Sequence, residues 1–145
     1  MIDEKTRLLR ALDESRAALW GVMDDIDPSA EIYPGWDKRD FFAHIAGWEA
    51  WVFETFRDGA AVPYDTKRYT TVDAANAVFV AERRSASLET AKLECEINRF
   101  ANRQYLLDIT AEDFHSPFSL PWEEPDVAAF VESAITHERD HAREI

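Results

Sequence analysis

Apolar residues recur every three or four positions along most of the chain, and this spacing is typical of one face of an α-helix. The first such segment extends from about Asp3 to Met23, and the carboxylate of Asp3 is suited to cap the helix N-terminus. The sequence DPS at residues 27–29 predicts that the helix ends before it. The apolar side of this helix is predicted to comprise Leu8, Leu9, Leu12, Leu19 and Val22.

A second helix is predicted to begin near Lys38, with Asp37 as its N-cap, and to end by Gly59. Its inward positions advance by three or four residues and place a histidine among aromatic side chains. We therefore expect His44 to share the buried side of this helix. The predicted stripe consists of Phe41, His44, Trp48, Trp51 and Thr55.

Two further helical segments follow the connection VPYDTKRYTT. Thr71 is the predicted cap of the segment VDAANAVFVAERR, and the helical pattern resumes after Ser87 as LETAKLECEINRFANRQYLLDI. Ser85 and Ser87 predict a kink or break between the two segments. The inner side of the longer helix is predicted to include Leu88, Ala91, Cys95, Asn98, Tyr105 and Leu106.

The stretch TAEDFHSPFSLPWEEP holds three of the six prolines and predicts an irregular crossover. Pro125 suits the first turn of a final helix. Val, Ile and Thr do not gather into alternating runs, so strand signals are weak. We predict an all-α fold, a four-helix bundle with a long crossover before the last helix, that forms one domain over residues 1–145.

Composition narrows the classes of partner. The formal net charge of −13 disfavours nucleic acid and anionic membrane surfaces, because both repel an acidic protein. Cys95 is the single cysteine, so an internal disulfide is excluded, and no apolar run is long enough for a signal peptide or a membrane span. We expect a cytoplasmic protein that acts on a small molecule.

Two histidines near the C-terminus stand one helical turn apart. Because an α-helix turns about 100° per residue, His137 and His141 project from the same side. Steps of four, three and four join them to Phe130 and Ala134, so we expect the pair to point inward. His44, on the inner stripe of the second helix, is the natural third donor.

Three imidazoles would suit zinc, nickel or iron and would leave positions open for water or substrate. Two alternatives stay open: a single histidine on an apolar face is commonly a hydrogen-bonded core residue, and HxxxH pairs also occur on charged surface helices. His115, in the crossover, is interpreted as a surface or loop-packing residue, with substrate contact as the lesser option. Glu49, Glu138 and Asp140 are expected on a solvated face or in hydrogen bonds to the imidazoles.

The residues HERDH, from His137 to His141, match the HExxH pattern of zinc proteases, with Glu138 in the position of the general base. A protease needs a peptide-binding cleft, usually with an edge strand, and this chain offers almost no strand signal. We therefore keep Glu138 only as a candidate general base acting on metal-bound water.

In these motifs the chain resembles the DinB-like superfamily of four-helix bundles, which includes mycothiol-dependent maleylpyruvate isomerases and bacillithiol transferases. The matching segments are WDKRDFFAHIAGWEAW, residues 36–51, and THERDHAREI, residues 136–145. The resemblance implies that His44, His137 and His141 form a divalent metal site, that a low-molecular-weight thiol is ionised there, and that two chains associate as a homodimer. Small self-resistance hydrolases that open the cyclopropane of a genotoxin are also similar, but those lack the full triad.

Three functions are consistent with the sequence. The first is a metal-dependent transferase or hydrolase acting on a small electrophilic or thiol-linked molecule. The second is a binding or sequestering bundle in which a metal is structural or absent. The third is a metal-free hydrolase of the self-resistance type, whose aromatic cavity would be lined by Trp48, Trp51, Phe130 and Trp122; a plain aromatic core is the alternative to such a cavity.

Overall fold

The computed structural model describes residues 3–58, 71–118, 120 and 123–145, and these contain six helices and no strands. The predicted all-α class is confirmed for this part of the chain. Two isolated bridges join loop residues. The predicted connection at residues 62–71 and the predicted cavity residue Trp122 fall largely or wholly outside the described residues. The helices are α1 (Glu4–Asp24), α2 (Lys38–Asp58), α3 (Val72–Glu82), α4 (Leu88–Asp108), α5 (Ala111–Phe114) and α6 (Val127–Glu144).

Capping side chains fix most of the helix starts. The predicted caps Asp3, Thr71 and Ser87 each accept a hydrogen bond from a backbone N–H in the first turn of their helix. Asp37 accepts from the backbone N–H of Asp40 at 3.0 Å, while the Asp40 carboxylate accepts from the N–H of Asp37 at 3.3 Å, so the start of α2 is capped reciprocally.

The last helix begins later than predicted. Asp126, rather than a residue before Pro125, is the N-cap of α6, because its carboxylate accepts from the backbone N–H of Ala129 at 2.6 Å. Pro125 lies just outside the helix, where its carbonyl accepts a hydrogen bond from Phe118. The crossover is also less irregular than predicted, since Thr110 caps the single-turn helix α5.

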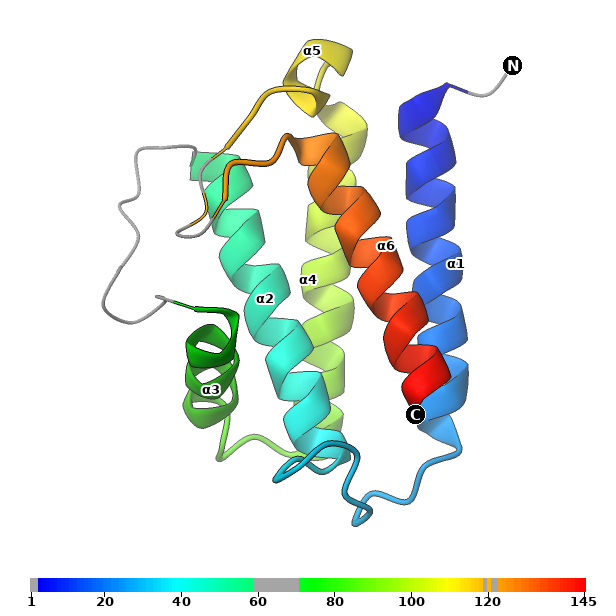
Figure 1. Cartoon of the computed structure of the whole chain (residues 1–145), viewed down its shortest axis with the longest axis vertical. Coiled ribbons are helices and arrows are strands. Elements are labelled where there is room, and N and C mark those ends of the chain that lie inside the picture. Colours follow the sequence, from blue (N-terminus) through cyan, green and yellow to red (C-terminus); the bar gives the residue numbers. More distant parts are fainter. Residues whose placement is uncertain (1–2, 59–70, 119, 121–122) are drawn as a thin grey trace.

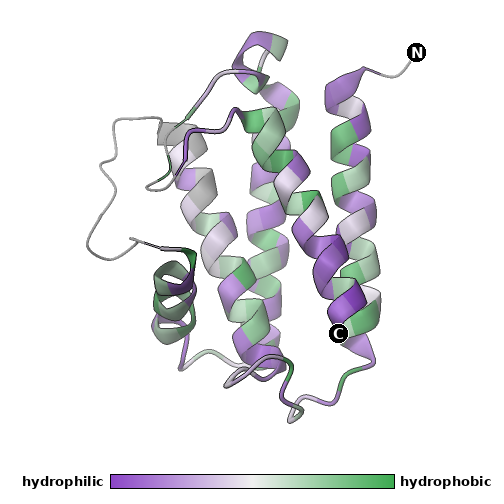
Figure 2. Ribbon diagram, viewed as in Figure 1, coloured by the Kyte–Doolittle hydropathy of each residue, from purple (hydrophilic) through white to green (hydrophobic). Residues whose placement is uncertain are grey.

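Four long helices lie side by side, with α2 against α4 and α1 against α6 (Figure 1). Hydrophilic and hydrophobic residues alternate along each of them (Figure 2). The short helix α3 packs on α2 at Gly47, where a β-carbon would lie 2.2 Å from the Phe79 ring. Glycine at this position therefore allows α3 to approach α2 closely. None of the helices in the described part of the chain is long and apolar enough to cross a membrane.

The buried residues form two apolar clusters instead of one continuous core. Both α1 and α4 contribute buried residues to the two clusters, while α6 contributes to the first and α2 to the second, and a polar layer separates the clusters. The first cluster comprises Leu8, Leu9, Leu12, Leu106, Phe114, Val127, Ala128, Val131 and Ile135. The second comprises Leu19, Met23, Phe41, Phe42, Ile45, Ala46, Ala91 and Cys95.

The predicted inner stripes are correct in part. Met23 is fully buried where Val22 was expected, and Asn102 is buried although only its neighbours on α4 were predicted. On α6 the most buried stripe is Val131, Ile135 and Glu138, one position along from the predicted one. The predicted stripe, Phe130, Ala134, His137 and His141, lines a cavity instead.

Candidate functional site: a cavity with histidine and charged walls

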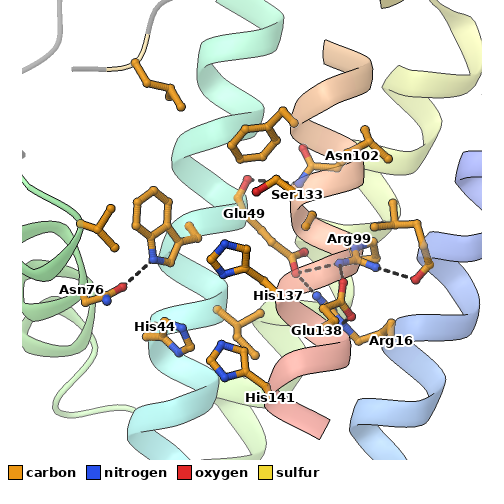
Figure 3. Close-up of a pocket in the computed structure, with 18 of the residues that line it drawn as sticks. Arg16, His44, Glu49, Asn76, Arg99, Asn102, Ser133, His137, Glu138 and His141 are labelled. Atoms are coloured by element: carbon orange, nitrogen blue, oxygen red, sulfur yellow. Dashed lines mark hydrogen bonds and ion pairs between the residues drawn. The ribbon is translucent and has the colours of Figure 1, made fainter. Parts of the chain in front are cut away.

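A cavity of about 490 Å³ opens between the long helices, with α3 along one side (Figure 3). Most of the surface that its wall exposes is apolar, and its polar side chains gather in two places, one around the histidines and one around buried arginines and glutamates. The polar side chains of the wall are Arg16, Tyr33, His44, Glu49, Asn76, Arg99, Asn102, Glu123, Ser133, His137, Glu138 and His141.

His44 is held in one orientation near the start of α2. Its Nδ1 lies 2.7 Å from the carbonyl oxygen of Phe41, and because a carbonyl can only accept, Nδ1 must carry the proton. The ring nitrogen with a free lone pair is therefore Nε2. The side chain is only 7% exposed, and this burial lowers the pKa of His44 to about 4, so the imidazole is neutral at physiological pH.

His141 on α6 has the same pattern of hydrogen bonding. Its Nδ1 lies 2.7 Å from the hydroxyl of Tyr33, and that hydroxyl donates to Glu144 at 2.5 Å. Since the tyrosine has one hydroxyl proton and gives it to Glu144, it accepts from Nδ1 of His141, and Nε2 again keeps its lone pair. Burial also lowers the pKa of His141, while burial and the Glu144 carboxylate raise the pKa of Tyr33.

The tight turn YPGW places aromatic side chains on both histidines. Pro34 and Gly35 occupy its two central positions, Gly35 has φ +80°, and the N–H of Trp36 donates to the carbonyl of Tyr33 at 2.8 Å. These are the features of a type II turn, which requires a left-handed residue at its third position. The Trp36 ring centroid lies 4.8 Å from that of His44, and Tyr33 holds His141.

The structure brings His44 and His141 together across two helices, with ring centroids 5.7 Å apart. His137 lies 6.5 Å from His141 by the same measure, and its residue is exposed. Two imidazoles bound to one tetrahedral zinc at ~2 Å would have ring centroids ~5 Å apart. Over residues 3–58, 71–118, 120 and 123–145, no group of three or more His, Cys, Asp and Glu could hold a metal ion in its present arrangement.

The donor chemistry of the His44 and His141 pair nevertheless fits a metal. Imidazoles that bind metals usually donate their other ring N–H to a carbonyl, carboxylate or similar acceptor, which fixes the tautomer. Both residues have this arrangement, with Nδ1 engaged and Nε2 left free. His137 is the residue whose ring would have to move to complete the triad, so the three-histidine site stays a prediction.

Glu138 does not lie among the histidines. The expectation of a solvated carboxylate or an imidazole partner is wrong for Glu138, because its side chain is buried against two arginines. Arg16 donates from Nε to its Oε2 at 3.1 Å, and Arg99 pairs with its other oxygen. A carboxylate engaged by two guanidinium groups is poorly placed to accept a proton from water, so the geometry does not favour Glu138 as a general base.

The two arginines and two glutamates form a closed ring of alternating charge, which we call the charge ring. Arg16 comes from α1, Glu49 from α2, Arg99 from α4 and Glu138 from α6, so each long helix supplies one member (Figure 3). Arg16 also pairs with Glu49, and Arg99 lies 3.5 Å from the same Glu49 oxygen. The ring is the polar layer between the two apolar clusters.

The charge ring affects the pKa of Arg16. Desolvation on burial lowers the pKa of Arg16, but the carboxylates of Glu49 and Glu138 outweigh it, so the pKa is raised overall. Three atoms of the wall, all within the described residues, are buried without a hydrogen-bond partner: Arg16 Nη1, Glu49 Oε2 and Asn102 Oδ1.

Sequence reasoning missed the charge ring, although a signal was present. Arg16 follows Leu12 by four residues and precedes Leu19 by three, so a charged residue occupies the apolar stripe of α1. Arg99 likewise lies between Cys95 and Asn102 on α4. Charged residues at inward positions of two helices predict acidic partners on neighbouring helices, because buried charges need compensation.

The remaining predicted residues have simpler surroundings. His115 is exposed and its Nε2 lies 2.9 Å from Glu4, which confirms it as a surface residue. Asp140 pairs with Arg143 on the surface of α6. Trp48 and Phe130 line the cavity as predicted, and Trp51 does not. All three pack against the first apolar cluster.

The described residues thus define an all-α protein with paired helices around a partly polar cavity. No protein-family model, curated protein or solved structure matches the chain. The fold class rests on the helices themselves, and a function has to be argued from the cavity.

Proposed function

We propose that this protein is a metal-dependent transferase or hydrolase that acts on a small electrophilic or thiol-linked molecule within the cavity. The observation that carries the proposal is the matched state of His44 and His141: each imidazole is buried or half-buried, each has Nδ1 engaged, and each leaves Nε2 free. Both residues line the cavity, and an imidazole whose Nδ1 is engaged by a neighbour presents Nε2 as a metal-binding nitrogen.

His44 and His141 would hold the ion, and His137, one turn earlier on α6, is the third donor. A divalent zinc, nickel or iron ion bound there would lower the pKa of a bound water or thiol and so supply a nucleophile at neutral pH. The chain itself contributes the walls: Trp48 and Phe130 offer apolar surface for a substrate, and Tyr33 and Trp36 keep the two imidazoles in place.

The fold that we infer for this function is a four-helix bundle of the DinB-like type. It is supported by the four long helices, by the motif segments that contain His44, His137 and His141, and by the placement of these residues on one cavity. A low-molecular-weight thiol as second substrate and a homodimeric state belong to the same proposal.

The test begins with protein purified without a nickel column and analysed for bound metals. Elemental analysis should find about one divalent ion per chain, as expected for a single site. The protein is then assayed against alkyl halides, epoxides and maleyl compounds, each with and without a panel of cellular thiols, before and after treatment with EDTA. Turnover that is lost in EDTA and returns with one metal supports the proposal, and turnover unaffected by EDTA contradicts it.

A second candidate is a binding or sequestering bundle that works without metal. It is favoured by the present arrangement of the described residues, in which no three ligand side chains are gathered for an ion, and by the largely apolar cavity. A metal-free hydrolase of the self-resistance type would share this feature. If metal-free protein binds electrophiles without turning them over, the protein is a binding or sequestering bundle. If metal-free protein turns them over, it is a hydrolase of the self-resistance type.

A further inference from the structure

The outer face of α4 carries a stripe of exposed apolar side chains. Leu93, Ile97, Phe100 and Leu107 are 54%, 59%, 65% and 43% exposed, and they follow one another at steps of four, three and seven residues. In the described part of the chain, they are four of the five large apolar side chains that are exposed. A contiguous apolar patch of this kind on the surface of a globular protein indicates an interaction site.

The stripe lies on the side of α4 that is turned away from the cavity. The helix buries Ala91, Cys95, Asn102 and Leu106, and at about 100° per residue these positions point roughly 180° away from the stripe. One flank of α4 packs on α2, and the other flank hydrogen-bonds to α1. Figure 1 shows α4 at the back of the four long helices, behind α2 and α6. The stripe is therefore part of the outer surface and not of the candidate site.

The spacing of the stripe suits a second helix. Alternating steps of four and three residues are the spacing of the seam between two paired helices. Gln104 occupies the polar position that completes this pattern between Phe100 and Leu107. The seam from Leu93 to Leu107 extends for about 20 Å along the helix, at about 1.5 Å per residue. A helix of another polypeptide therefore fits the stripe better than a small molecule does.

Charges along one edge of the stripe complement those of a second copy of the chain. This edge faces α1, because Glu96 accepts from Trp20 at 3.3 Å and Arg103 pairs with Asp13 at 2.9 Å. Glu96 and Arg103 lie on opposite sides of the stripe's centre, close to Phe100. If a second α4 packs antiparallel about a two-fold axis near this centre, Glu96 of each copy comes level with Arg103 of the other.

The same charges disfavour a parallel pair of helices. In a parallel pair, an edge residue of one helix faces the residue five positions later in the other, which would place Glu89 beside Glu94 of the second copy. In an antiparallel pair the same edge of each copy meets, so the contact between Glu96 and Arg103 forms twice. Such a pair is a closed dimer with two-fold symmetry.

We propose that the exposed stripe of α4 is the contact between two copies of this chain, packed antiparallel about a two-fold axis near Phe100. The four apolar side chains expose on the order of 100 Å² each, about half of the roughly 800 Å² per partner that a stable interface buries. Flanking polar residues of α4 supply the rest, so we expect a reversible dimer with a dissociation constant in the micromolar range. This assignment deepens the proposed function and rests on it only for the homodimeric state.

The first experiment measures association of the full-length chain by sedimentation equilibrium in EDTA. Salt at about 0.15 M screens much of the repulsion between two chains that each carry a formal charge of −13. Raising the concentration from ~1 μM to ~500 μM should convert the unmodified chain from mostly monomer to mostly dimer. Phe100→Lys places two ammonium groups at the two-fold axis and should weaken the dimer at least about a hundredfold.

The variant remains a fair comparison because Phe100 is 65% exposed, so its circular dichroism spectrum should match that of the unmodified chain. A chain that stays monomeric at the highest concentration would overturn the proposal. A dimer that Phe100→Lys leaves intact would overturn it as well, because the two copies would then meet through another surface.

Charge reversals test the antiparallel arrangement. Glu96→Arg and Arg103→Glu each create two contacts between like charges, so each variant alone should associate roughly tenfold more weakly. An equimolar mixture of the two variants should associate about as well as the unmodified chain, because every contact then joins an acidic and a basic side chain. Mixing cannot repair a defect within either chain, so this recovery reports the contact between chains.

Glu132→Arg, on the exposed side of α6, is the control because it changes the net charge as Glu96→Arg does. It should leave the dissociation constant of the dimer within about twofold of that of the unmodified chain. Equal weakening by Glu132→Arg and Glu96→Arg, or no recovery when the two reversals are mixed, would overturn the antiparallel contact.

The experiment separates this proposal from the proposed function, because sedimentation in EDTA depends on neither metal nor turnover. A monomeric chain that binds metal and turns over electrophiles would lose the α4 contact and retain the proposed activity. A chain that dimerises through α4 and turns over no substrate would retain the contact and lose the activity.

Discussion

The charge ring and the histidine pair are both buried polar groups on the same cavity wall, yet they are satisfied in opposite ways. In the ring, Arg16, Glu49, Arg99 and Glu138 compensate one another almost completely across four helices. In the pair, His44 and His141 each use Nδ1 in a hydrogen bond and leave Nε2 free.

This difference indicates different uses. Charges that close on themselves hold α1, α2, α4 and α6 in one register, since a shifted helix would leave a buried charge uncompensated. Imidazoles that are held in a fixed tautomer with free nitrogens gain nothing further from the protein and are available to a ligand. We therefore expect changes in the ring to affect mainly folding, and changes in the pair to affect mainly binding.

The largest effect should come from the ring. Glu138→Ala leaves the guanidinium groups of Arg16 and Arg99 without their shared carboxylate, and breaking a buried pair in this way costs about 3–5 kcal/mol. The measurement is urea unfolding followed by circular dichroism. Glu132→Ala, on the exposed side of the same helix, is the control and should change the free energy of unfolding by less than about 0.5 kcal/mol. A loss below about 1 kcal/mol for Glu138→Ala would show that the ring does not hold the helices.

The next effect concerns the pH dependence of stability. The pKa of His44 is about 4 in the folded protein, against about 6.5 in an unfolded chain, so the unfolded state takes up the proton first as the pH falls. Neutral His44 therefore contributes roughly 3 kcal/mol to the free energy of unfolding at neutral pH, and this contribution is lost as the pH falls from about 6.5 to about 4. Above about pH 6.5 this group causes no change in stability.

The comparison of the chain with its His44→Gln variant isolates this effect, because all other titrating groups are common to both. Unfolding is measured in EDTA at intervals from pH 7 to pH 4. The unmodified chain should lose more stability than the variant over this interval, and parallel curves would contradict the buried, neutral state of His44.

A smaller effect is expected from changing Tyr33, which orients His141 of the histidine pair. Tyr33→Phe removes the hydroxyl that accepts from His141 Nδ1 and donates to Glu144. Loss of one partly buried hydrogen-bond partner should cost about 1 kcal/mol. Nitrogen-15 NMR should show that His141 no longer populates a single tautomer, while Glu144→Gln, which keeps an acceptor, should shift it less. An unchanged His141 spectrum in Tyr33→Phe would remove the tyrosine from this role.

The smallest effect is predicted away from both regions. His115→Ala removes an exposed ion pair with Glu4, and exposed pairs contribute less than about 1 kcal/mol. Its thermal midpoint and its ligand binding should match those of the unmodified chain. A marked loss of binding would mean that the crossover takes part in the site.

The sequence predicts most helices well because their signals are local. Asp3, Thr71 and Ser87 cap α1, α3 and α4 as expected, since a cap involves only the first turn. The buried face of α6 is harder to predict, because apolar residues occupy two adjacent faces of this helix. Sequence spacing alone cannot tell which face packs against α1 and which face lines the cavity.

The candidate site could be predicted only in part for a similar reason. Helical spacing places His137 and His141 on one side of α6, and the structure brings His141 to His44. The pairing of Arg16 with Glu138, far apart in the sequence, depends on how four helices meet. The role of Tyr33 depends on a turn that precedes α2 and reaches the end of α6.

The most direct test of the account is a calorimetric titration of metal-free protein with zinc. The unmodified chain and His115→Ala should bind about one ion tightly, and His44→Ala and His141→Ala should each lose at least about a hundredfold in affinity, with His137→Ala also weakened. Zinc binding that is unchanged when His44 and His141 are both replaced would contradict the claim that their free nitrogens hold a metal.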